Sequence, residues 1–406
     1  MTAARRLSGY AATLAVLLAV TPVPAHAQGE PQPLPERPQE CLPPPQETAV
    51  RTPWPQQMLR QRQVWPLSEG KGVTVAVVDT GVDAANAQFG GRVSAGVDVT
   101  ATGAADTDCL GHGTFVAGII GAAPVAGSGF AGVAPAVTIL PIRVATTMDD
   151  DKAGSLTPKR LADGIRRAVD GGANVINVSA GTTDQSPELA AAVLYAEQKD
   201  VVVVASVANE KEKGVKATYP AAFPSVLAVG AVDSAGAHVE TSAVARYLGL
   251  AAPGKDVVSI GPGGRGHWQG SGTSYAAPFV AGTAALVRAY HPGLDAAGVR
   301  DRLRATAIPP AAAVPDPALG WGTVDPVAAV TEVLPRESGA LVRPPDLPPP
   351  PPAATEELHT VLAVVGVLAA IGGSFVLVWL ARLIGSAHRR RWRPARTMSA
   401  KPTTES

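Results

Sequence analysis

The alternation of strand-like and helix-like segments between residues 73 and 306 is the feature that most limits how this chain can fold. Apolar runs typical of buried strands cover residues 73–79, 137–144, 175–179, 201–205 and 226–232. Helical patterns cover residues 115–122, 158–170, 187–198 and 295–306. Strands and helices that alternate in this way form a mostly parallel sheet covered by helices on both faces, so we predict an α/β fold.

An apolar segment also lies at the N-terminus, before this pattern begins. Arg5 and Arg6 precede an apolar run over residues 11–20, and Ala25-His26-Ala27 supplies the small residues of a cleavage site. This combination is typical of a secretory signal peptide, which we place at residues 1–27. The mature protein is then exported from the cytoplasm.

A second apolar segment, residues 360–380, contains no charged side chain and is long enough to span a bilayer as a helix. Glu356 and Glu357 precede it. The arginines that follow it are Arg382, Arg389, Arg390, Arg391, Arg393 and Arg396. Because basic flanks stay in the cytoplasm, we predict a single-pass type I protein of the cell membrane whose folded domain is extracytoplasmic.

These observations divide the chain into six parts. We predict a signal peptide at 1–27, a Pro-rich arm at 28–66, a folded domain at 67–334, a Pro-rich spacer at 335–358, a transmembrane helix at 359–381 and a basic cytoplasmic tail at 382–406. The arm is too rich in proline to build a core, so we expect it to wrap the folded domain. The spacer is expected to be stiff and extended.

The cysteines, the net charge and the acidic residues indicate which crosslinks, partners and metal sites to expect. Cys41 and Cys109 are the only cysteines, and export to an oxidising compartment favours one disulfide between them over two free thiols. Lys plus Arg and Asp plus Glu are each 34, so the overall charge indicates no nucleic-acid partner. The three successive acids 149–151 lack the spacing of metal ligands and are typical of a solvated face, so we predict no metal site and no cofactor.

Three segments hold candidate catalytic residues. Asp79 ends a predicted parallel strand, His112 is flanked by glycines at a predicted helix start, and Ser274 precedes another helical pattern. Carboxyl ends of parallel strands are where sites form in such sheets, and a helix N-terminus favours an oxyanion. The alternative for the last segment is that Thr273 and Ser274 only cap the helix. Among the other histidines, His238, His267 and His291 are interpreted as surface or structural residues.

Taken together, these segments resemble the signature segments of the subtilisin-like serine proteases. The matching stretches are Val-Val-Asp79-Thr-Gly, Gly-His112-Gly-Thr-Phe-Val-Ala-Gly and Gly-Thr-Ser274-Tyr-Ala-Ala-Pro, in the chain order Asp, His, Ser. The resemblance covers roughly residues 65–330. It implies a subtilisin-like fold and a serine endopeptidase in which Ser274 attacks the peptide carbonyl, His112 transfers the proton and Asp79 orients the imidazole.

The same resemblance implies two further groups of site residues. Ser179, Ala180 and Gly181 match the segment whose backbone pairs with an extended peptide substrate. Asn209 matches the residue that shares the oxyanion with the backbone N–H of Ser274. The family usually has glycine before this asparagine, whereas this chain has Ala208.

The layout around the catalytic segments resembles a narrower group, the mycosins. Mycosins are membrane-anchored proteases of type VII secretion systems, and the resemblance implies a partner in such a membrane complex besides a protein or peptide substrate. An alternative is a mainly structural role in that complex with dispensable proteolysis. A general degradative protease is a third possibility, which the membrane tether disfavours.

Overall fold

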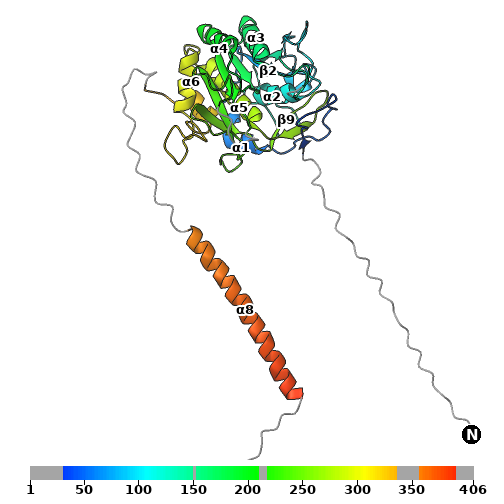
Figure 1. Cartoon of the computed structure of the whole chain (residues 1–406), viewed down its shortest axis with the longest axis vertical. Helices are drawn as coiled ribbons and strands as arrows, with labels where there is room; N and C mark the ends of the chain where they lie inside the picture. The colour runs from blue at the N-terminus through cyan, green and yellow to red at the C-terminus, as the bar shows by residue number, and fades with distance from the viewer. Residues whose placement is uncertain (1–30, 150–151, 210–216, 336–355, 390–406) are drawn as a thin grey trace, which may run out of the picture. The chain divides into compact units, whose positions relative to one another are not determined.

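The computed structural model describes residues 31–149, 152–209, 217–335 and 356–389, and in the last helix it describes the side chains of residues 365–385. The chain divides into two units, residues 1–342 and 343–406, which are treated separately (Figure 1). The predicted signal peptide and most of the predicted spacer and basic tail lie outside the described residues.

The first unit is built on a seven-stranded sheet in which every strand pair is parallel. Its strand order is β3-β4-β2-β5-β6-β7-β8. The strands are β2 (Thr74–Asp79), β3 (Val97–Asp98), β4 (Thr138–Arg143), β5 (Val175–Val178), β6 (Val202–Ser206), β7 (Val226–Val232) and β8 (Leu248–Pro253). The five central strands were predicted from the sequence. The two edge strands, β3 and β8, were missed.

Helices cover both faces of this sheet, as predicted. Figure 1 shows α3 and α4 on one face and α2 and α5 on the other, and each pair packs against its own cluster of buried apolar side chains. The helices are α2 (His112–Gly121), α3 (Pro158–Asp170), α4 (Pro187–Gln198), α5 (Thr273–Tyr290), α6 (Ala296–Ala305) and α7 (Pro326–Thr331). Since helices and parallel strands alternate, the carboxyl ends of the strands share one edge of the sheet.

Side-chain caps fix where α3, α4 and α6 begin. The hydroxyls of Thr157 and Ser186 accept hydrogen bonds from backbone N–H groups in the first turns of α3 and α4, and a proline follows each of them. Asp295 caps α6 in the same way. A cap followed by proline satisfies free N–H groups and presets the backbone for a helix, which explains the agreement between predicted and observed boundaries.

The N-terminal arm lies along the domain. Strand β1 (Gln32–Pro33) pairs in parallel with β10 (His267–Gly270), which pairs in antiparallel fashion with β9 (Val257–Ile260). Helix α1 (Trp54–Leu59) and the 3₁₀ turn η1 (Gln61–Gln63) follow. Helix α1 ends at Leu59, and its C-cap residue, Arg60, adopts a left-handed conformation with φ of 52°.

A disulfide joins the arm to the loop before α2. Cys41 and Cys109 are bonded across a sequence separation of 68 residues. Next to this bond, the backbone N–H of Leu42 donates to the carbonyl of Cys109 at 2.8 Å. In the loop-entropy view, a crosslink of this span stabilises the folded state by about 4 kcal/mol.

His267 links the arm to β10 from inside the protein. The backbone N–H of Ala49 donates to His267 Nδ1 at 3.2 Å, and the side chain is almost fully buried. Burial lowers the pKa of His267 to about 4. The imidazole is therefore neutral at pH 7, which leaves Nδ1 free to accept this bond.

We expect the stability of the domain to fall between pH 6.5 and pH 4 because of His267. The folded-state pKa lies below the unfolded value of about 6.5, so only the unfolded state binds a proton in this range. The contribution is fully present above pH 6.5, and about 3 kcal/mol is lost as the pH falls to 4. Urea unfolding at several pH values measures this loss. His267→Asn keeps an acceptor that does not titrate and should flatten the dependence, whereas an unchanged slope would contradict the assignment.

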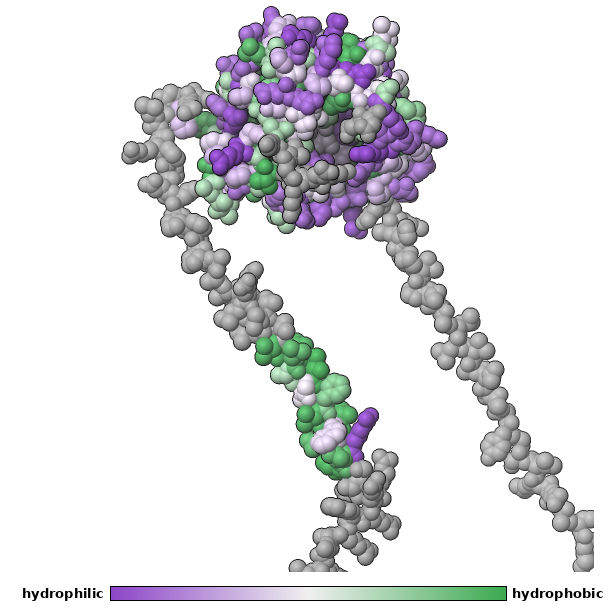
Figure 2. All heavy atoms as spheres, viewed as in Figure 1, coloured by the Kyte–Doolittle hydropathy of each residue, from purple (hydrophilic) through white to green (hydrophobic). Residues whose placement is uncertain are grey.

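The second unit contains one long helix, α8 (Glu356–Arg389). Its segment Val365–Gly385 is long and apolar enough to cross a membrane, and its described side chains are exposed and mostly hydrophobic (Figure 2). The predicted transmembrane segment, 359–381, overlaps this span, and the side chains of residues 359–364 lie outside those that the structure describes. Apolar side chains exposed all around a helix favour a lipid environment over water.

Candidate active site

Asp79 and His112 are in direct contact at the carboxyl edge of the sheet. Asp79 is the last residue of β2 and His112 is the first residue of α2. His112 Nδ1 lies 2.7 Å from Asp79 Oδ1, and both side chains are buried. A neutral imidazole that donates from Nδ1 to a carboxylate leaves Nε2 free to accept a proton.

Small residues allow the strand end and the helix start to approach this closely. A Cβ atom placed on Gly113 would lie 2.0 Å from the carbonyl oxygen of Gly81 and 3.1 Å from Asp79 Cβ. Gly81 itself has a φ of 105°, and a Cβ there would lie 2.2 Å from the carbonyl oxygen of Thr107. The glycines beside Asp79 and His112 are therefore required by the backbone contact between the two segments.

Ser274 lies in the first turn of α5. The helix starts at Thr273, Gly272 is its N-cap, and no side chain caps it. The alternative that Thr273 and Ser274 cap the helix is therefore wrong, because both residues lie inside it. The backbone N–H of Ser274 points out of the helix N-terminus, where the helix dipole favours negative charge.

Helix α5 brings Ser274 toward His112. The ring of Tyr275, the next residue, packs against the ring of His112 with centroids 5.4 Å apart and against Phe115 at 4.6 Å. Ser274 is partly exposed, whereas His112 is buried. Among the described residues, Ser274 Oγ makes no hydrogen bond with His112. Such contacts are often long in a free enzyme and shorten when substrate binds.

Asn209 lies beside the start of α5. Its Oδ1 accepts a hydrogen bond from the backbone N–H of Thr273 at 2.9 Å. A Cβ atom on Gly272 would lie 3.0 Å from Asn209 Nδ2 and 3.4 Å from Ser274 Oγ, so both side chains border the same small space. With Oδ1 engaged, the Nδ2 amide of Asn209 remains as a donor next to the serine.

Ala208 adopts the conformation that a glycine would take at this turn. Its φ is 90°, a value that L residues with a Cβ rarely adopt. The departure from the family pattern at this position therefore leaves the turn in place and adds backbone strain next to Asn209.

We expect Ala208→Gly to stabilise the protein by about 0.5–1 kcal/mol. Removing the Cβ relieves a strain of roughly 1–2 kcal/mol, and the greater freedom of glycine in the unfolded chain offsets part of this gain. Thermal unfolding of both proteins measures the difference. Ala205→Gly, in the buried strand β6, is the control and should destabilise. A destabilising effect at position 208 would show that this alanine is not strained.

The segment Ser179–Gly181 follows β5 and lies beside the candidate catalytic residues. Among the described residues, no backbone hydrogen bond engages Ala180 or Gly181. Ser179 has an additional contact that the sequence did not predict: its Oγ donates to the carbonyl of Ser274 at 2.8 Å and accepts from Asn177 Nδ2 at 2.8 Å. Its side chain thus connects β5 to the first turn of α5.

A pocket of about 120 Å³ joins several of these residues. Asp79, His112, Ala180 and Gly181 line it together with side chains from the segments after β4. The pocket lining is Asp79, Thr80, His112, Val144, Ala145, Thr147, Met148, Leu156, Ala180 and Gly181. Its lining combines the Asp79–His112 pair with apolar side chains such as Val144, Met148 and Leu156, a mixture that suits a peptide ligand.

The charges around His112 set its proton affinity. Burial by itself lowers the pKa of His112, but the charge of Asp79, the hydrogen bond with Asp79 and the charge of Asp108 raise it, and the net pKa lies above the usual 6.5. Burial also raises the pKa of the Tyr275 hydroxyl, with a further contribution from Asp79. His112 is thus a stronger base than a free imidazole, and Tyr275 stays neutral.

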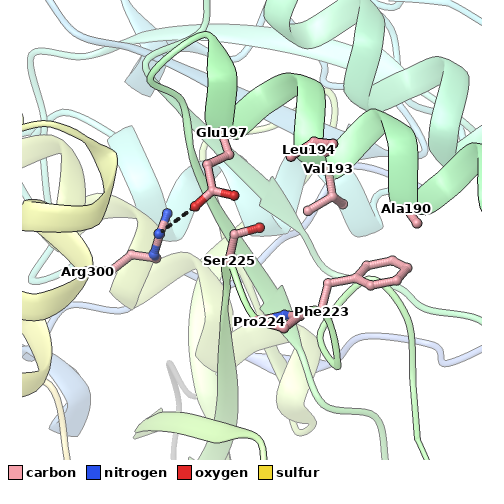
Figure 3. Close-up of a pocket in the computed structure, with 8 residues that line it drawn as sticks. All are labelled: Ala190, Val193, Leu194, Glu197, Phe223, Pro224, Ser225 and Arg300. Carbon is pink, nitrogen blue, oxygen red and sulfur yellow. Dashed lines mark hydrogen bonds and ion pairs between the residues drawn. The ribbon is translucent and has the colours of Figure 1, made fainter.

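Two other features of the described residues, an acidic run and a second pocket, do not include Asp79, His112 or Ser274. Asp149, the described member of the acidic run, pairs with Lys152 at 2.6 Å, and no group of three or more candidate metal ligands occurs among the described residues. A pocket of about 330 Å³ lies beside the amino end of β7. Figure 3 shows Glu197 of α4 paired with Arg300 of α6 on one side of it and the ring of Phe223 on the other.

Comparisons with known proteins agree with this architecture. The model of the subtilase family matches residues 70–322. Mycosin-4 of Mycobacterium tuberculosis is 38% identical over 307 residues, which cover 66% of this chain and 67% of the relative. Subtilisin DY of Bacillus licheniformis is 38% identical over 241 residues, covering 59% of this chain and 85% of that enzyme.

Solved structures extend the similarity beyond the catalytic segments. The MycP3 protease from the type VII (ESX-3) secretion system has a TM-score of 0.64 and 33% identity, covering 75% of this chain and 95% of that one. A chain of an intact ESX-5 inner membrane complex has a TM-score of 0.63 and 30% identity and covers 87% of this chain and 97% of its own. The chain described here therefore belongs to the subtilase family of serine proteases and, within it, to the mycosins.

Proposed function

We propose that this protein is a membrane-anchored, extracytoplasmic endopeptidase in which Ser274, His112 and Asp79 form the catalytic triad. The observation that carries the proposal is the 2.7 Å contact between His112 Nδ1 and Asp79 Oδ1 at the carboxyl edge of the sheet. It orients the imidazole and leaves Nε2 as the base for the Ser274 hydroxyl. The extended segment 179–181 beside it provides the backbone that pairs with the peptide.

The reaction follows from these positions. His112 Nε2 takes the proton of Ser274 Oγ as that oxygen attacks the peptide carbonyl, and the charge of Asp79 stabilises the imidazolium that forms. The backbone N–H of Ser274 and Asn209 Nδ2 donate hydrogen bonds to the oxyanion. His112 then returns its proton to the leaving amine, which leaves an acyl ester on Ser274. Water, deprotonated by His112, hydrolyses this ester and regenerates the serine.

A fluorophosphonate probe tests whether this nucleophile is activated. Ser274 Oγ is expected to attack phosphorus and release fluoride, and mass spectrometry of the labelled peptide should place the adduct on Ser274. His112→Ala should prevent labelling. Absence of labelling in a folded wild-type protein, or an adduct on another serine, would refute the proposed triad.

We also propose that the protease works within a type VII secretion complex. The supporting observation is the extent of similarity to a chain of the ESX-5 inner membrane complex, which includes 87% of this protein. Detergent extraction of native membranes, followed by affinity purification of the full chain, should recover the membrane subunits of that system. Recovery of the protease alone under mild extraction would contradict this partnership.

A mainly structural role in that complex is the second candidate, and the same similarity supports it. The two roles make different predictions for secretion. If proteolysis is required, Ser274→Ala abolishes secretion as completely as deletion of the gene does. If the structure is what the complex needs, only the deletion abolishes it. Immunoblots of culture filtrates distinguish these outcomes when both strains contain the other membrane subunits at equal levels.

A further inference from the structure

We infer that Asp108 is a positioning residue for the proposed triad, because its buried carboxylate ties the end of β2 to the first turn of α2. Asp79 ends β2 and His112 begins α2, so this tie sets the distance between them. The inference rests on the proposed function of these two residues. Asp108 lies four residues before His112 and was not singled out from the sequence.

The contacts of Asp108 reach both segments. Oδ1 accepts hydrogen bonds from Thr80 Oγ1 at 2.9 Å and from the backbone N–H of Gly111 at 2.9 Å. Oδ2 accepts from the backbone N–H of Thr114 at 2.8 Å and from Thr114 Oγ1 at 2.7 Å. The residue is only 5% exposed, so water competes little for these bonds.

Helix α2 needs this carboxylate because it begins without a cap of its own. Its N-cap is Gly111, which has no side chain to accept a hydrogen bond. Asp108 accepts from the N–H of Thr114, and Thr80 Oγ1 accepts from the N–H of Gly113 at 3.0 Å. The hydroxyl of Thr80 in turn donates to Asp108. The first turn of α2 is thus capped by two residues that also fix the end of β2.

The position of Asp79 depends on the same tie. Asp79 Oδ1 accepts hydrogen bonds from His112 Nδ1 and from the backbone N–H of Thr80 at 2.8 Å. Thr80 therefore connects to Asp79 through its backbone and to Asp108 through its side chain. A loss of Asp108 releases Thr80 and the first turn of α2 together, and the contact between Asp79 and His112 loses its support from both ends.

Asp108 also contributes charge to the site. The charged or titratable groups around His112 are Asp79 from β2, Asp108 from the preceding loop and Tyr275 from α5, while Arg143 of β4 bonds to the carbonyls of Thr80 and Thr107. The negative charges of Asp79 and Asp108 both favour protonated His112. Burial raises the pKa of Asp108 above its usual value, with a contribution from the charge of Asp79, although hydrogen bonds from Thr114 and Gly111 oppose this shift. The two backbone N–H donors, one on each oxygen, match an ionised carboxylate.

Asp108→Asn in the full-length protein tests the inference. The variant keeps the shape of the side chain but replaces one acceptor oxygen with a donor amide and removes the charge. We expect the fluorophosphonate to label it completely but about 10- to 100-fold more slowly at saturating probe, with the half-saturating probe concentration within about twofold of wild type. The acid limb of the labelling rate plotted against pH should move to lower pH. The reason is that the loss of one negative charge lowers the pKa of His112.

Asp106→Asn is the matched control. Asp106 lies two residues away and is partly exposed, and its carboxylate makes none of the bonds described for Asp108. This variant should label at the wild-type rate. A purely structural role for Asp108 would reduce the fraction of protein that labels while leaving the rate constant and the acid limb unchanged. That result, or a wild-type rate for Asp108→Asn, would overturn the inference.

A second pair of variants decides the question if Asp108→Asn does not fold. Thr80→Val removes the hydroxyl that joins Asp108 to Gly113 but keeps the carboxylate, and Thr80→Ser restores the hydroxyl. We expect slow labelling of the first and near-normal labelling of the second. A wild-type rate for Thr80→Val would overturn the inference while the triad stands. If the folded wild type itself does not label at Ser274, the proposed function fails, and this positioning role fails with it.

Discussion

Replacement of Ser274 by alanine is expected to reduce kcat for peptide hydrolysis on the order of 10⁶-fold, the size found when the equivalent serine of a subtilisin is removed. The variant retains the proposed oxyanion donors and the proposed peptide-binding segment, but it has no oxygen to form the acyl ester. Hydrolysis of a peptide library by the purified full-length protein, with products identified by mass spectrometry, measures the loss.

Ser271→Ala is the matched control for this substitution. Ser271 lies three residues before Ser274, and its Oγ bonds with Asp256 in an exposed turn. Its activity should equal that of the wild type. Both variants should unfold at nearly the same temperature as the wild type, since neither removes apolar core volume. Residual hydrolysis by Ser274→Ala above about 1% of wild type would mean that another nucleophile carries the reaction.

Asp79→Asn is expected to lower kcat about 10⁴-fold with little change in KM. The amide has nearly the shape of the carboxylate, so its oxygen can still accept from Thr80 and His112. It carries no charge to stabilise the imidazolium that forms when His112 takes the serine proton. Its Nδ2 would occupy the place of Asp79 Oδ2, which is buried and has no hydrogen-bond partner among the described residues, so the amide protons would also be unsatisfied there.

The pH dependence of the same variant provides an independent check. In the wild type, kcat/KM should rise with pH through a midpoint above 6.5, because His112 must be neutral to act as a base and its pKa is raised. In Asp79→Asn the midpoint should move to lower pH. Asp163→Asn, on the exposed face of α3, should leave both rate and midpoint unchanged. An acid limb that stays in place in Asp79→Asn would exclude His112 as the group that controls it.

The central strands and the long helices could be predicted from sequence because their signals are local. Residues 73–79 and 226–232 are rich in Val and Ala, and the prolines after Thr157 and Ser186 fix two helix starts. Strand β10, His-Trp-Gln-Gly, has no such signal. It becomes a strand because β9 and β1 pair with it, and these partners are distant in the sequence or not recognisable in isolation.

The candidate site also contains residues that a local sequence signal predicts and residues that only the fold reveals. The signature segments predicted Asp79, His112 and Ser274, and the structure brings the first two into hydrogen-bond contact. The sequence did not reveal the bond from Ser179 to the carbonyl of Ser274, nor the bonds of Asp108, because these depend on how separate segments meet. One usable signal was present for Asp108: an acid lies shortly before a predicted helix start at His112 where glycine, which has no capping side chain, is the preceding residue.

The pairing of the arm with β10 has a consequence for the order in which the protein folds. Ala49 and His267 are 218 residues apart in the chain, whereas the disulfide spans 68. A chain made from its N-terminus contains β1 long before β10 is synthesised. The Cys41–Cys109 crosslink is therefore able to form before the sheet of β1, β10 and β9 is complete. Contacts at this separation slow folding, because the entropy cost of closing a long loop comes before the contacts that stabilise the closed state. The crosslink shortens the loop that must close, because it keeps the arm beside the domain until β10 pairs with β1.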